Sequence, residues 1–385
     1  MYDSLPVEIW RQIFAVAVRS CVHAQRLQAA GDDDHDPFNL GSPHLLRHTL
    51  KTKLSLCLVS KGFNSLASEF LYESIYFASH ERLISAIRHS TRGGTSKFWW
   101  TKVLALRFWY TMGSSVASVA HLLSKCVNLR LLVFAAPTMG PEVGLDQVRS
   151  VYRSVPRSVQ AVRWIMGDQP IFQNIPTTML DNICQMSIES RTMMSTPVLT
   201  LPRLTYFRAK DAFGPFNLTF PALRSVCFVA WQRNTKLETT PLGLFIQSYA
   251  EQITTLRFEN GGDTFTMEFP ISLIDCCTNL TTLEYDPFVM CPLQFNNPDT
   301  LVQHTKLTRV HLFISVPPAY LAYFPVKLWE INSQWLLLGG LPALKHICLR
   351  RSCVPDSVEE HFLSLIDGTC TDPRLNLECG GSACT

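Results

Sequence analysis

One apolar phrase returns throughout the chain from residue 100 onward, and it constrains the fold more than any other feature of the sequence. The phrase has an apolar residue, two variable residues, a second apolar residue, one variable residue and a third apolar residue. Apolar alternation of this kind is typical of a short strand with one buried face. Copies begin at Val103, Leu129, Val159, Leu204, Leu223, Ile253, Leu280, Leu307 and Leu344.

The copies share more than their apolar spacing. Because 47% of the residues are hydrophobic, a single match arises by chance at roughly one position in ten. Several copies, however, belong to longer related segments such as CVNLRLL, LPRLTYF and LPALKHI, and several follow helix-compatible apolar segments such as SVASVAHLLSKC. The sequence therefore predicts repeated strand and helix units, the alternative being an irregular α/β domain whose buried strands share one pattern.

Successive copies start between 19 and 45 residues apart. A spacing of about 20 to 29 residues is expected for leucine-rich repeats, and the array resembles a degenerate form of that family. The resemblance implies an α/β fold in which an irregular leucine-rich-repeat solenoid spans residues 79–367, followed by a flexible tail over 368–385.

The phrase also predicts which residues face outward. Its last two apolar residues point into the solenoid, so the residue between them projects from the concave face of the sheet. Seven basic residues against three acidic ones occupy these central and flanking positions, a net charge of +4. We hypothesise that this face binds an acidic or phosphorylated protein segment, the alternative being solvated sheet residues. The predicted target-binding residues are Arg107, Trp109, Arg163, Tyr206, Arg208, Lys210, Arg257, Arg309 and His311.

The N-terminal segment LPVEIWRQIF predicts an amphipathic helix. Pro6 suits a first helical turn, and Ile9, Ile13 and Phe14 recur at helical spacing. Asp3 and the polar residues that interrupt the apolar run exclude a secretory signal peptide. The apolar stripe is wider than one short helix needs.

Two further apolar helical patterns occupy the region from Leu54 to Leu71, after an acidic, Gly- and Pro-containing stretch that predicts an inserted loop at about 22–48. Three short helices of this kind form a bundle with little core of its own. Either a partner or the rest of the chain must cover it.

These helices resemble the F-box motif, through Leu5-Pro6-x-Glu8-Ile9-x-x-x-Ile13-Phe14 and Leu56-x-x-Val59-Ser60-Lys61-x-Phe63-x-x-Leu66. The resemblance implies a small F-box-like helical bundle over residues 1–78 that binds a Skp-type adaptor and, through it, a cullin. Roughly residues 20 to 50 separate the two halves of the motif, so docking requires that the fold bring them together. The implied adaptor-binding residues are Leu5, Pro6, Ile9, Ile13, Phe14, Val59 and Phe63.

Together the two resemblances imply a non-catalytic substrate receptor of a ubiquitin ligase complex. A leucine-rich-repeat scaffold that joins no ligase is the alternative, and an enzyme with an unrecognised site is a third reading. The sequence contains no G-x-S-x-G, P-loop, H-E-x-x-H or C-x-x-C motif. His44 and His48 are four residues apart, but no cysteine pair completes a zinc set. We therefore expect no cofactor and no metal.

Charge and cysteine content suggest the compartment. The formal net charge of +3 is too small to predict binding to nucleic acid, and no apolar run reaches the roughly 20 residues of a membrane span. Without a signal peptide, the 13 cysteines are expected to be buried thiols in a reducing environment. An intracellular protein, cytoplasmic or nuclear, follows.

Overall fold

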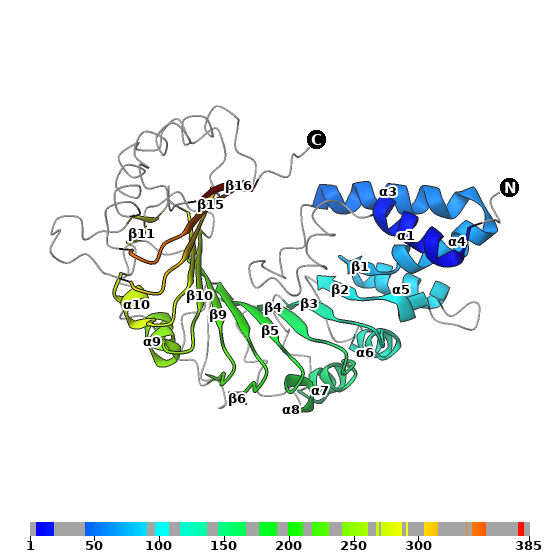
Figure 1. Ribbon diagram of the computed structural model, residues 1–385. Helices are drawn as coiled ribbons and strands as arrows, with labels where there is room; N and C mark the ends of the chain where they lie inside the picture. Colours follow the sequence, from blue (N-terminus) through cyan, green and yellow to red (C-terminus); the bar gives the residue numbers. More distant parts are fainter. Residues whose placement is uncertain are drawn as a thin grey trace. The chain divides into compact units, whose positions relative to one another are not determined.

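The protein is described by a computed structural model (Figure 1). It describes residues 5–18, 43–90, 97–107, 116–136, 145–166, 177–190, 199–210, 218–230, 241–260, 267–268, 271–286, 290–291, 304–314, 336, 341–351 and 376–380. The chain divides into two compact units. The first unit comprises Met1–Glu189 and Thr196–Arg203, and the second comprises Ser190–Ser195 and Leu204–Thr385.

The first unit combines the N-terminal helices with the first strands of the sheet. Strands β1 to β5 are neighbours in chain order, and the pairs β1–β2, β2–β3 and β3–β4 are parallel. Figure 1 shows α6, α7 and α8 on the same side of these strands. The described elements are α1 (Val7–Val18), α3 (Pro43–Val59), α4 (Lys61–Leu71), β1 (Ser74–Phe77), α5 (His80–Ser90), η2 (Lys97–Trp100), β2 (Val103–Arg107), α6 (Val116–Lys125), β3 (Leu131–Ala136), α7 (Leu145–Arg153), β4 (Ala161–Met166), α8 (Thr177–Leu180), β5 (Gln185–Ser190) and β6 (Leu199–Thr200).

The second unit continues the same pattern of parallel strands. Its main strands follow the order β7-β9-β10-β12-β14-β15-β16, and β11 pairs with β13 separately. The described elements are β7 (Tyr206–Lys210), β8 (Leu218–Thr219), β9 (Ser225–Ala230), α9 (Pro241–Tyr249), β10 (Thr255–Asn260), β11 (Met267–Glu268), α10 (Ile271–Cys276), β12 (Thr282–Tyr285), β13 (Met290–Cys291), β14 (Arg309–Ile314), β15 (His346–Arg351) and β16 (Asn376–Gly380).

All nine predicted copies of the apolar phrase fall on strands of the main sheet, although the copy read from Val103 is shifted by two residues from the register of β3. Their leading residues are buried, from Leu129 at 0% exposed to Val103 at 9%. Where the structure describes their side chains, the last two apolar positions are buried as well, as at Leu132 and Phe134 of β3. Burial of each such side chain stabilises the fold by about 1.5–3 kcal/mol. The prediction of an α/β repeat fold is therefore confirmed, and the structure shows that the paired strands are parallel.

Threonine hydroxyls hold neighbouring repeats of the second unit together just before their strands begin. Thr281 Oγ1 donates to the carbonyl oxygen of Thr254 at 3.1 Å, and Thr308 Oγ1 donates to that of Thr281 at 3.2 Å. Each hydroxyl thus donates a hydrogen bond to a backbone carbonyl oxygen at the point where the chain enters the sheet. This explains why the segments ITTLRF, LTTLEY and LTRVHL carry threonine at the same place.

Three predicted boundaries are wrong. The break at residue 78 does not separate two units, because the bundle and the first strands cluster together and β1 already belongs to the sheet. The inserted loop ends earlier than residue 48, since α3 begins at Pro43. The predicted flexible tail contains β16, which pairs with β15.

The repeat analysis also missed β5. Its segment ICQMSI fits the phrase, with Ile183, Met186 and Ile188 each 0% exposed. It divides the longest step, from Val159 to Leu204, into steps of 24 and 21 residues, both within the usual leucine-rich-repeat range.

Candidate functional site

The two separated halves of the N-terminal motif pack against each other in the first unit. Aromatic rings join them: Trp10 and Phe14 of α1 lie 4.8 Å and 5.0 Å, centroid to centroid, from Phe63 of α4. Arg11 adds a two-pronged ion pair to Glu69, with Nη2 2.8 Å from Oε1 and Nε 3.1 Å from Oε2. The insertion therefore does not keep the two halves apart in the fold.

Ser60 explains how the motif turns from one helix into the next. It is the N-cap of α4, and its Oγ accepts a hydrogen bond from the Phe63 backbone N–H at 3.1 Å. Asn64 Nδ2 donates to the carbonyl oxygen of Cys57 at 3.1 Å and so ties α4 to the end of α3. The break between α3 and α4 thus lies at Ser60, and Lys61 and Gly62 belong to the first turn of α4.

Helix α1 has two apolar faces. The inner face contains Phe14 and Val18, which are 1% and 6% exposed. The outer face contains Ile9, Ile13 and Val16, which are 38%, 42% and 72% exposed. This arrangement accounts for the unusually wide stripe in the sequence, because one side packs on the bundle and the other stays uncovered.

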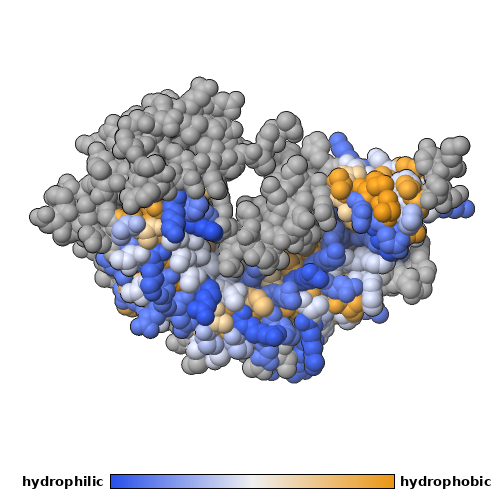
Figure 2. All heavy atoms as spheres, viewed as in Figure 1, coloured by the Kyte–Doolittle hydropathy of each residue, from blue (hydrophilic) through white to orange (hydrophobic). Residues whose placement is uncertain are grey.

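A second apolar stripe lies on α3, where Leu50, Leu54 and Leu58 follow each other at intervals of four residues and are 44%, 46% and 86% exposed. Figure 2 shows hydrophobic residues gathered over α1 and α3. Contiguous exposed apolar patches on soluble proteins mark interaction sites. The outer apolar face is defined here as Leu5, Val7, Ile9, Ile13, Val16, Leu50, Leu54, Leu58 and Val59.

Five of the seven predicted adaptor-binding residues are exposed, namely Leu5, Pro6, Ile9, Ile13 and Val59. The other two serve the bundle itself. Phe14 is 1% exposed and Phe63 is half-buried, because both rings fill the contact between α1 and α4. The prediction that Phe14 touches a partner is therefore wrong. The leucines of α3 were missed, although their four-residue spacing is visible in the sequence.

The predicted central row of the sheet exists in the second unit. Backbone pairing aligns Arg208 with Cys227, Cys227 with Arg257 and Arg257 with Glu284. The row continues from Glu284 to His311 and on to Cys348. In the first unit Val133 aligns with Arg163, but the β2 residue in register with Val133 is Ala105. Arg107 is two positions farther along because buried Thr101, not Val103, occupies the first position of that repeat.

The arginines of this row are neutralised by an ion-pair ladder. Glu259 lies 2.8 Å from Arg208 and 2.8 Å from Arg257, while Glu284 lies 3.2 Å from Arg257 and 3.2 Å from His311. The five side chains are between 2% and 18% exposed. Cys227, between Arg208 and Arg257 in the row, is small enough for Arg208 to reach Glu259 on a strand two away.

Electrostatics favour the charged state of this ladder. Burial alone would raise the pKa of Glu259, but Arg257, Arg208 and hydrogen bonds from Arg208 and Cys227 lower it below its ordinary value. The positive charges of the two arginines and the negative charges of the two glutamates cancel. The prediction of an exposed, net positive row is therefore wrong for this part of the sheet.

The remaining predicted target-binding residues lie in mixed surroundings. Arg163 is half-buried and forms an ion pair with Glu189 of β5. This partner was not predicted, because the repeat that contains β5 was missed. Tyr206 and His311 are buried, Lys210 is half-buried and Arg309 is exposed. Trp109 lies outside the described residues. The row does not assemble into one exposed binding surface.

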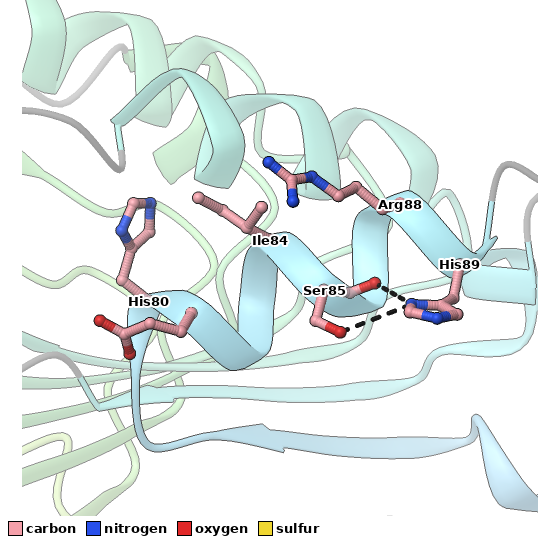
Figure 3. Close-up of a pocket in the computed structure, with 6 residues that line it drawn as sticks. His80, Ile84, Ser85, Arg88 and His89 are labelled. Carbon is pink, nitrogen blue, oxygen red and sulfur yellow. Dashed lines mark hydrogen bonds between the residues drawn. The ribbon is translucent and has the colours of Figure 1, made fainter.

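A shallow pocket of about 330 Å³ lies along α5. Figure 3 shows Ser85 and His89 side by side, with Ser85 Oγ 3.4 Å from His89 Nδ1. The same nitrogen lies 2.6 Å from the Ser85 carbonyl oxygen, to which it donates. It therefore carries a proton and cannot accept one from the hydroxyl, so this pair is unsuited to nucleophilic catalysis. The lining residues are His80, Glu81, Ile84, Ser85, Arg88 and His89.

Buried thiols match the interpretation of the cysteines at three positions. Cys126, Cys227 and Cys277 are free and buried. Burial raises the pKa of Cys126 to about 12, so this thiol stays protonated and unreactive. Within the described part of the chain, no cluster of His, Cys, Asp and Glu could hold a metal ion. Among the same residues, no helix has the length and apolar character to cross a membrane.

Comparison with known proteins finds matches at low identity among solved structures. No protein family matches the sequence, and no curated protein does. Among solved structures, the leucine-rich repeat-containing protein LegL7 from Legionella pneumophila is 12% identical, with a TM-score of 0.43, over 80% of this chain and 96% of its own. A protein from Bacteroides fragilis is 9% identical, with a TM-score of 0.36, over 80% of this chain and 74% of its own.

Proposed function

We propose that this chain is the substrate-recognition subunit of a Skp–cullin–F-box type ubiquitin ligase. The outer apolar face binds the adaptor, and the repeat sheet carries the surface that holds a target protein. The observation that carries this proposal is the exposure of the motif residues Leu5, Ile9, Ile13 and Val59 on a bundle whose interior is already filled by aromatic rings.

The outer face supplies the interaction energy that such docking needs. Those four residues are 38–63% exposed, which leaves roughly 3–6 kcal/mol of apolar burial available to a partner. The leucines of α3 enlarge the surface further. Part of this gain is offset by the entropy lost on association, so several of the residues must act together.

Neither unit needs to perform chemistry in this role. The receptor holds a target lysine close to a ubiquitin-charged enzyme and so raises the effective concentration of the reacting groups. The Ser85–His89 geometry described above fits this non-catalytic role.

Affinity capture of the full chain against a purified Skp-type adaptor tests the proposal. The adaptor is expected to bind the unmodified chain, and a variant with aspartate on the outer face of α1 is expected to lose it. A folded chain that fails to capture any Skp-type adaptor would instead favour the rival reading, a repeat scaffold that joins no ligase.

A further inference from the structure

The exposed basic surface of the first unit lies at the edge of the sheet where the strands begin, away from the predicted central row. We call this surface the amino edge and define it by the segments 97–102, 125–130, 153–160, 181–184 and 201–203. Hydrogen bonds join three of these segments: Asn128 Nδ2 donates to the Trp99 carbonyl oxygen at 2.8 Å, and Ser158 Oγ donates to that of Val127 at 2.7 Å. Arg203 similarly reaches Asn182 at 3.3 Å.

The amino edge has a strong excess of positive charge. Its segments contain seven basic residues and one acidic residue, Asp181, a net charge of +6 where the whole chain carries +3. The basic residues other than Lys102 are exposed. They are Lys97, Lys102, Lys125, Arg130, Arg153, Arg157 and Arg203.

Several of these cations have a structural role that explains their presence. Lys102 pairs with Glu73 at 2.8 Å, and Lys97 lies over the Tyr72 ring at 5.5 Å. Lys125 and Arg153 end α6 and α7, where a cation favours the helix dipole. Within the part of the chain that the structure describes, no ion pair, ring contact or helix end accounts for Arg130 and Arg157, which stand in the turns before β3 and β4. Substitution of these two arginines therefore gives the most direct test of whether the edge binds a ligand.

Exposed apolar residues lie within the same edge. Trp99 and Trp100 are 54% and 39% exposed, and Val127, whose neighbour Asn128 is bonded to Trp99, is 39% exposed. Tryptophan and arginine are the residue types most enriched among the residues that dominate binding energy at protein interfaces. Cations arranged around an aromatic and aliphatic patch fit a ligand with both acidic and apolar side chains.

We propose that the amino edge of the first unit binds an acidic protein segment that carries an aromatic or aliphatic anchor residue. Its carboxylates pair with Arg130 and Arg157, and its anchor packs on Trp99, Trp100 and Val127. The mixture of indole rings with an aliphatic side chain favours a protein ligand over the bases of a nucleic acid, for which stacking faces alone are sufficient. This surface is independent of the outer apolar face, so it holds or fails separately from adaptor binding.

Fluorescence anisotropy with the full chain tests the proposal. The probe is a labelled peptide rich in Asp and Glu with one Trp, compared with the same peptide in its Asn and Gln form. The acidic peptide is expected to bind more tightly, and its affinity is expected to fall as salt rises. Arg130→Glu with Arg157→Glu is expected to weaken binding by about tenfold, and Trp99→Ala by a similar factor.

The second unit offers a matched control. Arg224 and Lys345 are exposed in the corresponding turns before β9 and β15, and Arg224→Glu with Lys345→Glu is expected to change the affinity by less than about twofold. Equal weakening by both charge-reversal pairs, or none by Arg130 and Arg157, overturns the proposal. So does tighter binding of a poly-dT oligonucleotide that the Arg130 and Arg157 changes abolish, because the edge is then a nucleic-acid site. Adaptor capture by the same variants stays unchanged.

Discussion

Replacing Ile9 and Ile13 together by aspartate tests whether the outer face of α1 is an interface. The two side chains are 38% and 42% exposed, next to each other on one side of the helix. Because neither fills the bundle, the change is expected to leave the fold intact, with a fall in melting temperature of only a few degrees. Phe14→Asp, by contrast, would place a charge among the rings that join α1 to α4.

The expected loss of affinity follows from these exposures. Removing each isoleucine loses about 0.6–1.3 kcal/mol of binding energy from apolar burial. This value is the burial energy of a full side chain multiplied by the exposed fraction of the isoleucine. Each aspartate also loses hydration when a partner covers it, at a cost of a further 1 kcal/mol or more. The sum is at least about 3 kcal/mol, which corresponds to more than about a hundredfold in Kd.

Isothermal titration calorimetry with a purified Skp-type adaptor measures this change directly. Gln12→Asp is the control for added negative charge, because it places one aspartate on the same helix at an exposed polar position and is expected to change Kd by less than about threefold. Circular dichroism checks that all variants keep their helices. A double variant that is folded and binds with unaltered affinity would refute the assignment of this face.

Three further changes probe stability, each followed by thermal or urea unfolding. Glu259→Gln is expected to cost about 3 kcal/mol because it removes the carboxylate that pairs with Arg208 and one of the two that pair with Arg257. Since the pKa of Glu259 is lowered on folding, the stability it provides is present at neutral pH and is lost in acid. The variant should therefore lose less stability than the parent as pH falls below about 4.5. Lys53 is 8% exposed and burial lowers its pKa. Lys53→Met should therefore raise the melting temperature at neutral pH and reduce the gain in stability that the parent shows toward pH 10. Lys51→Met, at an exposed position of the same helix, should leave the melting temperature at neutral pH unchanged. Ser60→Ala should cost about 1 kcal/mol by removing the α4 cap, and an unchanged unfolding midpoint would show that the cap contributes nothing.

The repeat and the helices are encoded locally, which is why the sequence alone predicted them. Buried residues such as Leu132 and Phe134 recur with the two-residue period of a strand, and the unit is short enough to recognise in one stretch. The wide stripe of α1 likewise indicated two apolar faces, and both exist. Strand β5 could also have been predicted from the sequence, since Ile183 and Met186 are buried residues that fit the same apolar phrase.

Tertiary structure decided the charge of each surface. Whether Arg257 is exposed depends on Glu259 and Glu284, and the latter comes from a neighbouring strand. Equally, whether Phe14 meets a partner or the bundle depends on Phe63, 49 residues away across the insertion. Alternation along a strand or helix assigns a side chain to a face, but only the neighbours brought there by folding determine whether that face is paired, buried or free to bind.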